Sequence, residues 1–262
     1  MTAVSTPSRK ATSAMIAVTL AAALAGGAAY AVRGPDMRYV PEMAARAVMM
    51  ADGHTIYVQK FEVTVAEWNR CHAEGGCDEP RRAPVDRPAA ETPATNLSHL
   101  DIEQYLRWIN RRSRHTFRLP SRAEWEYIAR DVMPDEPDPI FTDPELSWAS
   151  AYLTEGVAPR KLEVRGSFSE SAEGVVDLDG SVWEWTDDCY AGDSGIVPKE
   201  LCPAYWVGGE HIAAVPFVER DPARGGCAVG APPAHLGFRL VTDRMPRSLW
   251  DRVVKRDQNL AG

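Results

Sequence analysis

Apolar positions recur at short, regular intervals in three stretches of this chain. Residues 47–63 carry apolar side chains on both sides of Asp52-Gly53, the pattern of two strands joined by a tight turn. A second stretch begins with Ser98, a favourable helix cap, and has Asp101 three positions on. Four apolar residues then follow at helical spacing and predict a buried helix face: Ile102, Tyr105, Leu106 and Ile109.

The third stretch predicts another capped helix. Ser121 and Glu124 form a capping box, in which each side chain satisfies a backbone amide of the first turn, and an apolar run follows. Just before it, residues 117–119 predict a short strand that the following proline ends. Thr64 is expected to cap one more short helix, and the Pro-rich residues 79–93 are expected to form an extended surface connection.

Composition narrows the class of protein. The 262 residues are 45% hydrophobic and 25% charged, which is ordinary for a globular chain and argues against disorder. The 19 glycines and 20 prolines predict many turns and few long helices. The net charge of −8 provides no basic surface for a phosphate backbone, so no nucleic-acid partner is expected.

An uncharged, alanine-rich run opens the chain. It extends from Ala14 to Val32 behind Arg9 and Lys10, and it predicts that residues 1–32 are a signal peptide cleaved after Ala31. The alternative is an N-terminal membrane anchor, because the run nearly matches the roughly 20 residues that span a bilayer. In both cases the folded part is expected to be periplasmic or otherwise extracytoplasmic, and to meet the membrane only through this segment if it stays uncleaved.

The cysteines fit such a compartment, because an oxidising space lets thiols pair and persist. Cys71 and Cys77 flank a short glycine-containing loop, and Cys189 and Cys202 flank a longer polar one, so we expect disulfides within these two pairs. Cys227 is then left over, and such a thiol is reactive, metal-binding or linked to a partner. A buried, unreactive thiol is the alternative.

Three motifs in a fixed order carry a resemblance to a known family. A turn at Gly208-Gly209 and the segment 95–98 accompany them. Together they resemble the formylglycine-generating enzyme family, also called the sulfatase-modifying factor domain, over residues 40–242. The three motifs are FRLPSRAEWEYIAR at 117–130, GVVDLDGSVWEW at 174–185 and HLGFRL at 235–240.

The resemblance implies the family's α+β fold, with a C-type-lectin-like core and little regular secondary structure, and leaves residues 243–262 as a C-terminal tail. It also implies calcium as a structural ion. The family's ligands fall on the side chain of Asp177 and on the carbonyl oxygens of Leu178, Gly180 and Val182, all oxygen donors of the kind calcium prefers. The alternative is a hydrogen-bonded turn without an ion.

The family's oxidation chemistry is not expected here. Enzymes of the family that oxidise a substrate cysteine hold copper(I) with two cysteines, since thiolates and copper(I) are both soft. Alignment on Gly208-Gly209 places those two positions at Ala213 and Val218, and neither side chain can replace a thiolate.

A replacement metal centre is the other possibility that the sequence raises. Its soft and borderline ligands would hold copper or zinc if their loops converged, whereas ordinary structural roles are the alternative. The candidate ligands are Cys227, His211 and His235.

These patterns predict an exported family member that binds a peptide or a periplasmic enzyme and assists its maturation. Residues 217–239 are similar to a branch of the family associated with denitrification and copper nitrite reductase. The alternative is a metal-dependent oxidoreductase that modifies protein or small-molecule thiols with Cys227 and either His211 or His235. A third hypothesis is a structural component of the cell envelope.

Overall fold

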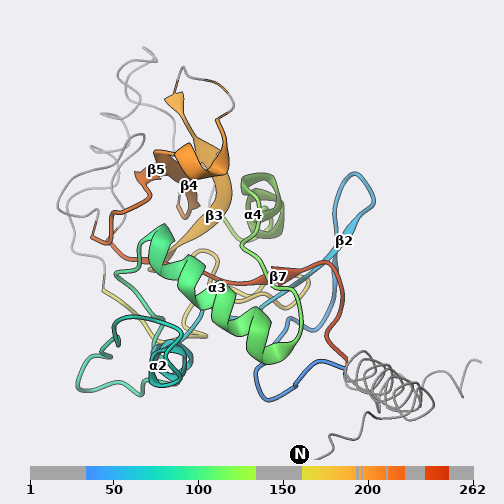
Figure 1. The fold of residues 1–262 in the computed structure, drawn as a ribbon. Helices are drawn as coiled ribbons and strands as arrows, with labels where there is room; N and C mark the ends of the chain where they lie inside the picture. Colours follow the sequence, from blue (N-terminus) through green and yellow to red (C-terminus); the bar gives the residue numbers. More distant parts are fainter. Residues whose placement is uncertain are drawn as a thin grey trace, which may run out of the picture. The chain divides into compact units, whose positions relative to one another are not determined.

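The computed structural model describes residues 34–133, 161–192, 195, 197–210, 212–221 and 234–247 (Figure 1). The chain divides into two compact units, Tyr39–Met245 and a second made of Met1–Arg38 with Pro246–Gly262. The helices and strands named below all belong to the first unit. The predicted leader at 1–32 and most of the predicted tail lie outside the described residues.

The predicted hairpin is confirmed and opens a small antiparallel sheet. It consists of β1 (Val48–Met49) and β2 (Thr55–Val58), and Gly53 occupies its turn with φ +88°, a backbone conformation that glycine adopts without strain. β2 also pairs with β7 (Val241–Thr242). This sheet therefore joins the beginning and the end of the unit Tyr39–Met245.

A second sheet carries most of the later sequence, in the order β5-β4-β3-β6. Its neighbours β3–β4 and β4–β5 are antiparallel and β3–β6 is parallel. The register of β3 against β4 shifts between Trp185 and Cys189. The short strands and few helices make this the expected α+β fold. The four strands are β3 (Trp183–Tyr190), β4 (Ala204–Gly208), β5 (Ile212–Pro216) and β6 (Leu236–Gly237).

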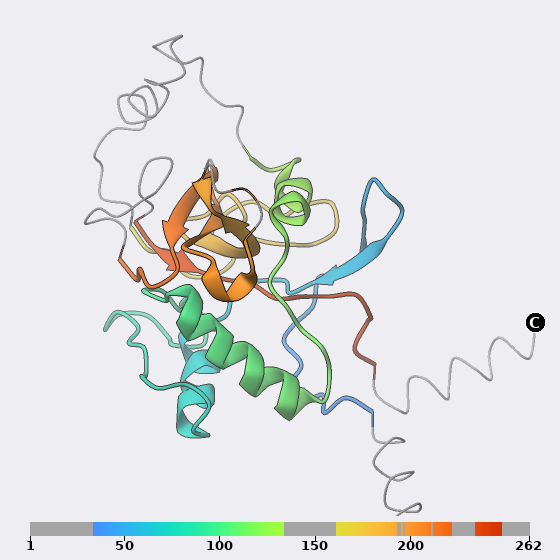
Figure 2. The same ribbon diagram turned by 45° about the horizontal axis from the view of Figure 1, so that its top comes forward.

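The three α-helices named here each begin at a capping box. The sequence predicts the cap of all three and the acidic partner of two, at Ser98 and Ser121. α2 and α3 lie side by side, and α4 packs against β3 and β4 (Figure 2). None of these helices is long and apolar enough to cross a membrane. With their caps they are α2 (Val65–Ala73, Thr64), α3 (His99–Ser113, Ser98) and α4 (Arg122–Ala129, Ser121).

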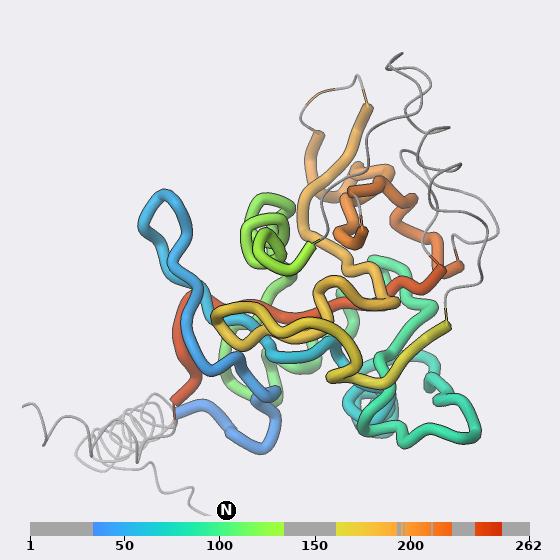
Figure 3. The backbone as a smooth tube through the Cα atoms, turned by 180° about the vertical axis from the view of Figure 1, so that it is seen from behind, coloured from blue at the N-terminus to red at the C-terminus, as the bar shows by residue number. Residues whose placement is uncertain are grey.

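The core is rich in aromatic side chains. Trp68 stacks on Tyr105 at 5.8 Å between ring centroids, and Phe238 meets both rings edge-on. Large aromatic groups bury much apolar surface each, which suits a fold with little regular structure. Behind this core, the segment that begins at 161 runs beside the chain that follows β2, where the Val176 amide donates to the carbonyl oxygen of Lys60 (Figure 3).

One local prediction is wrong. Residues 117–119 do not form a strand, because Arg118 makes an isolated bridge to Val241 and the neighbouring positions add no ladder. Pro120 lacks the amide that a longer ladder needs. The segment instead leads directly into the capping box of α4.

Candidate functional site

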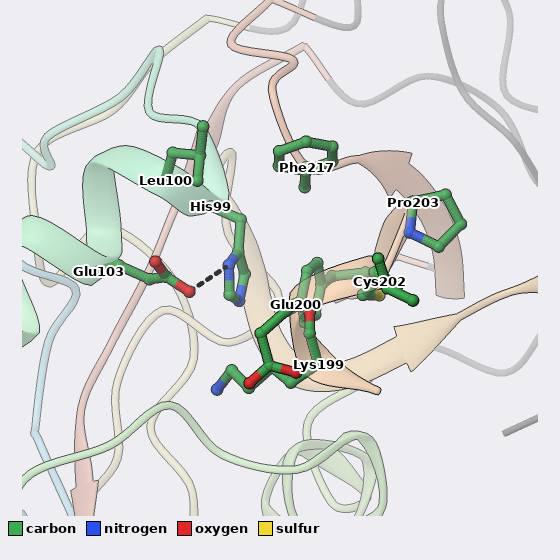
Figure 4. A pocket seen from close by; sticks show the side chains of 10 residues that line it. His99, Leu100, Glu103, Lys199, Glu200, Cys202, Pro203 and Phe217 are labelled. Atoms are coloured by element: carbon green, nitrogen blue, oxygen red, sulfur yellow. Dashed lines mark hydrogen bonds and ion pairs between the residues drawn. The ribbon is translucent and has the colours of Figure 1, made fainter. Parts of the chain in front are cut away.

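A cavity of about 620 Å³ opens between the start of α3, the chain entering β4, and the end of β5 (Figure 4). We call it the His99 pocket. Its polar side chains are on α3 and on the short 3-10 helix η3 (Lys199–Leu201), and its apolar side chains come from all three walls. The residues that line it include His99, Leu100, Glu103, Lys199, Glu200 and Phe217.

His99 is the most enclosed polar side chain of this pocket. It is 2% exposed, its ring stacks on Tyr205 at 3.6 Å between centroids, and Trp185 meets it edge-on. Burial lowers the pKa of His99 to about 4, since the charged imidazolium loses its hydration. The ring is therefore neutral at pH 7.

The disulfide Cys189–Cys202 fixes the wall opposite α3. It joins β3 to the residue that follows η3, with an S–S distance of 2.05 Å, so the exposed η3 turn is tied to the sheet. On η3, the Lys199 ammonium lies 2.5 Å from the Asp187 carboxylate of β3. Both predicted disulfides are confirmed, the other being Cys71–Cys77.

A second anchor holds the chain that follows β5 against α3. The Arg220 guanidinium donates two hydrogen bonds of 2.7 Å to the carboxylate of Asp101, the same residue that caps α3 with Ser98. Burial alone would raise the pKa of Asp101, but the bonds from Arg220 and Ser98 lower it. Paired, planar bonds of this kind fix orientation, so they set where Phe217 enters the pocket.

The positions matched to the family's two thiols lie on either side of Phe217 in the chain. Ala213 is on β5, opposite Val207, and is fully buried. Val218 is 57% exposed. The preceding Gly208 and Gly209 pack so closely against Trp125 and Trp183 that any side chain there would collide with the rings.

The candidate replacement centre cannot be assembled from the described residues, because Cys227 and His211 lie outside them. His235 is described and partly buried, and its carbonyl oxygen accepts a hydrogen bond from the Trp183 amide. Within the described part of the chain, no group of three or more His, Cys, Asp or Glu side chains is arranged to hold a metal ion.

The predicted calcium residues form a tight turn. Asp177 has φ +65°, its carbonyl oxygen accepts from the Gly180 amide, and its carboxylate accepts from the amides of Gly166 and Phe168. Each carboxylate oxygen thus accepts one backbone bond and keeps a lone pair that a cation could use. Leu178 and Val182 are buried in the core. Calcium binding at this turn stays a prediction.

The sequence motifs missed the His99 pocket. One signal was present: His99 lies three residues before Ile102, so a polar side chain extends the apolar face of α3. The contributions of η3 and Phe217 had no local signal, because a disulfide and a loop crossing bring them to α3 from about one hundred residues away.

A family model described as the sulfatase-modifying factor enzyme 1-like domain matches residues 4–244. The formylglycine-generating enzyme of Mycobacterium tuberculosis (strain ATCC 25618 / H37Rv) is 26% identical over 188 residues, which cover 58% of this chain and 57% of that protein. The chain thus matches little more than half the length of this curated relative.

Two solved structures resemble the chain more distantly. PvdO from Pseudomonas aeruginosa is 22% identical with a TM-score of 0.43, covering 71% of this chain and 80% of PvdO. CarF is 17% identical with a TM-score of 0.48, covering 78% of this chain and 98% of CarF. Since the family model matches most of the chain, and its motifs occur here in order, the protein belongs to the family of sulfatase-modifying factor enzyme 1-like domains.

Proposed function

We propose that this chain is a binding member of its family that works outside the cytoplasm. It holds a peptide segment of a partner enzyme in the His99 pocket and assists the maturation of that enzyme without oxidising a thiol. The observation that carries the proposal is a cavity at the end of β5, a strand that carries no thiol. Phe217 lines the cavity, whereas the positions matched to the family's thiols are Ala213 and Val218.

Two features support the extracytoplasmic setting. The disulfides Cys71–Cys77 and Cys189–Cys202 are of a kind that persists in oxidising compartments. The leading run at 14–32 reads as an export signal. The partner class we propose is a periplasmic enzyme of denitrification, and it rests on the similarity of residues 217–239 to that branch of the family.

The alternative oxidoreductase has less support. Every cysteine that the structure describes is in a disulfide, so thiol chemistry would depend on Cys227. A single cysteine and two histidines make a metal centre only when they converge.

Two assays test the proposal. Deletion of the gene from the source organism is expected to lower the activity of its periplasmic nitrite reductase, and the wild-type gene to restore it. The purified chain, given copper(I), oxygen and a cysteine peptide of the sulfatase type, is expected to form no aldehyde by mass spectrometry. Aldehyde formation that is lost in Cys227→Ala would establish the oxidoreductase instead. A deletion strain with normal reductase activity would refute the partner class.

A further inference from the structure

One nitrogen of the pocket histidine lacks a partner among the described residues. His99 Nε2 is buried and makes no hydrogen bond to any of them, although the residue lines a cavity. Buried polar atoms are nearly always hydrogen-bonded, and leaving one unpaired costs roughly 1–3 kcal/mol. Because His99 lines the cavity, a ligand group that reaches past the neighbouring side chains would complete this hydrogen bond.

The surroundings of His99 determine which group that is. Its other ring nitrogen, Nδ1, lies 3.8 Å from the Glu103 carboxylate, and this favours the proton on Nδ1 (Figure 4). Because burial keeps the ring neutral, Nε2 then carries a lone pair and no proton. The missing group must donate a hydrogen bond.

Charge narrows the choice further. The Lys199 ammonium is paired with Asp187, and the Glu103 carboxylate lies 3.7 Å from the exposed Arg107 guanidinium, so the anionic groups of the pocket are Glu200 and a partly compensated Glu103. They lie on opposite walls, on α3 and on η3. Leu100 and Phe217 add apolar surface on the other side of the ring (Figure 4). The pocket thus combines acceptors from separate walls with a hydrocarbon surface.

We propose that the His99 pocket binds an alkylammonium group, supplied by a lysine side chain of a partner peptide or by a free diamine. The ammonium donates to His99 Nε2 and faces Glu103 and Glu200, and its alkyl chain lies along Leu100 and Phe217. A compact ammonium with three rotatable donors suits acceptors that are not coplanar, whereas a planar guanidinium suits a single carboxylate. Lys199 and Glu200 are exposed side chains among the lining residues.

The peptide source rests on the proposed function, and the pocket chemistry does not. Deletion-strain activity tests the former and amine binding by the purified chain tests the latter, so each can fail alone. The probes are N-acetyl-lysine methylamide, cadaverine and, as an uncharged match, N-acetyl-norleucine methylamide. Binding is measured by calorimetry, and the imidazole nitrogen resonances of His99 report contact by NMR. The more tightly bound amine identifies the source.

Two substitutions that should change amine affinity in opposite directions make the test selective. His99→Phe keeps a flat ring on Tyr205 but removes the acceptor, and should weaken amine binding roughly tenfold or more. Glu200→Gln should weaken it about threefold and Lys199→Met should tighten it about threefold, since both positions are exposed. Glu126→Gln, on α4 outside the pocket, is the matched control and should change nothing.

General destabilisation cannot produce a loss at Glu200 together with a gain at Lys199. Equal binding of the norleucine probe would overturn the proposal, and so would failure of both amines to shift the His99 Nε2 resonance. Loss of folding in His99→Phe would leave the two surface variants to decide.

Discussion

Arg239 and His99 are both almost wholly buried, yet their polar atoms fare differently. The Arg239 guanidinium donates to both oxygens of Glu184 at 2.5–2.9 Å and to the carbonyl oxygen of Val176 at 3.0 Å. His99 Nε2 has no such partner among the described residues, and His99 lines a cavity. A buried charge with its bonds complete holds elements of the fold together, whereas an incomplete acceptor beside a cavity is available to a ligand.

Glu62 shows that an unpaired atom alone does not make a site. Its Oε2 is buried without a hydrogen bond to any described residue, 4.0 Å from Arg239 Nη2, and Glu62 does not line the His99 pocket. Burial raises the pKa of Glu62 to about 8, which favours the neutral carboxylic acid at pH 7. The cavity, together with the acceptor, distinguishes His99.

The largest expected effect is at Arg239. Arg239→Met leaves the Glu184 carboxylate buried without its cation, and should lower the free energy of unfolding by about 3–5 kcal/mol in urea titrations at pH 7. Adding Glu184→Gln should recover part of this loss, because no charge then remains unpaired. A loss below about 1 kcal/mol in the single variant would show that this pair does not hold the fold.

The free energy of unfolding should depend on pH in opposite directions through His99 and through Glu62. His99 has a lowered pKa in the folded protein, so the unfolded chain binds more protons between pH 6.5 and about 4. Stability should fall on acidification across that window, by on the order of 3 kcal/mol from this group. His99→Phe should flatten the acid limb of urea-derived stability. An unchanged limb would contradict the buried, neutral imidazole.

Glu62 should act in the opposite direction. Its folded pKa is raised, so its contribution to stability is complete below pH 4.5 and is lost as pH rises towards about 8. The glutamine of Glu62→Gln cannot ionise, so the variant should show a smaller fall in stability between pH 4.5 and about 8, the alkaline limb of the curve. The groups that face Glu62 are Arg239, Glu184 and Asp177. A steeper alkaline limb in the variant would argue against a protonated Glu62.

A smaller loss of stability is expected from a substitution at Gly208, the last residue of β4. A Cβ at Gly208 would lie 2.2 Å from the Trp125 ring, so Gly208→Ala must displace a buried tryptophan. We expect a loss of about 1–3 kcal/mol by thermal or urea unfolding. Val218→Ala, an exposed change in the chain after β5, is the control and should be near neutral.

The sequence predicts what depends on neighbouring residues and misses what depends on distant ones. The caps at Ser98 and Ser121 were predicted because each serine and its acidic partner are three residues apart, and the cap at Thr64 because a threonine hydroxyl can accept from an amide of the first turn. Arg118 was predicted to lie in a strand, but a strand needs several consecutive residues paired with another segment. Arg118 makes only an isolated bridge, to Val241. The His99 pocket needs three segments that only the folded chain brings together.

The smallest predicted effect concerns Asp177. Asp177→Ala removes the acceptor for the Gly166 and Phe168 amides and should cost roughly 1–2 kcal/mol whether or not an ion binds. If calcium binds as expected, a chelator also lowers the melting temperature of the wild type and leaves that of the variant unchanged. Equal melting of the wild type with and without chelator would remove calcium from the account.

Arg239 is proposed to hold the fold together and His99 to bind a ligand. The most direct test of this difference uses His99→Phe in the deletion strain. We expect the variant to unfold at pH 7 within about 1 kcal/mol of the wild type, because ring stacking on Tyr205 is kept. We also expect it to fail to restore reductase activity. A stable His99→Phe protein that restores the activity in full would contradict a binding role for the pocket.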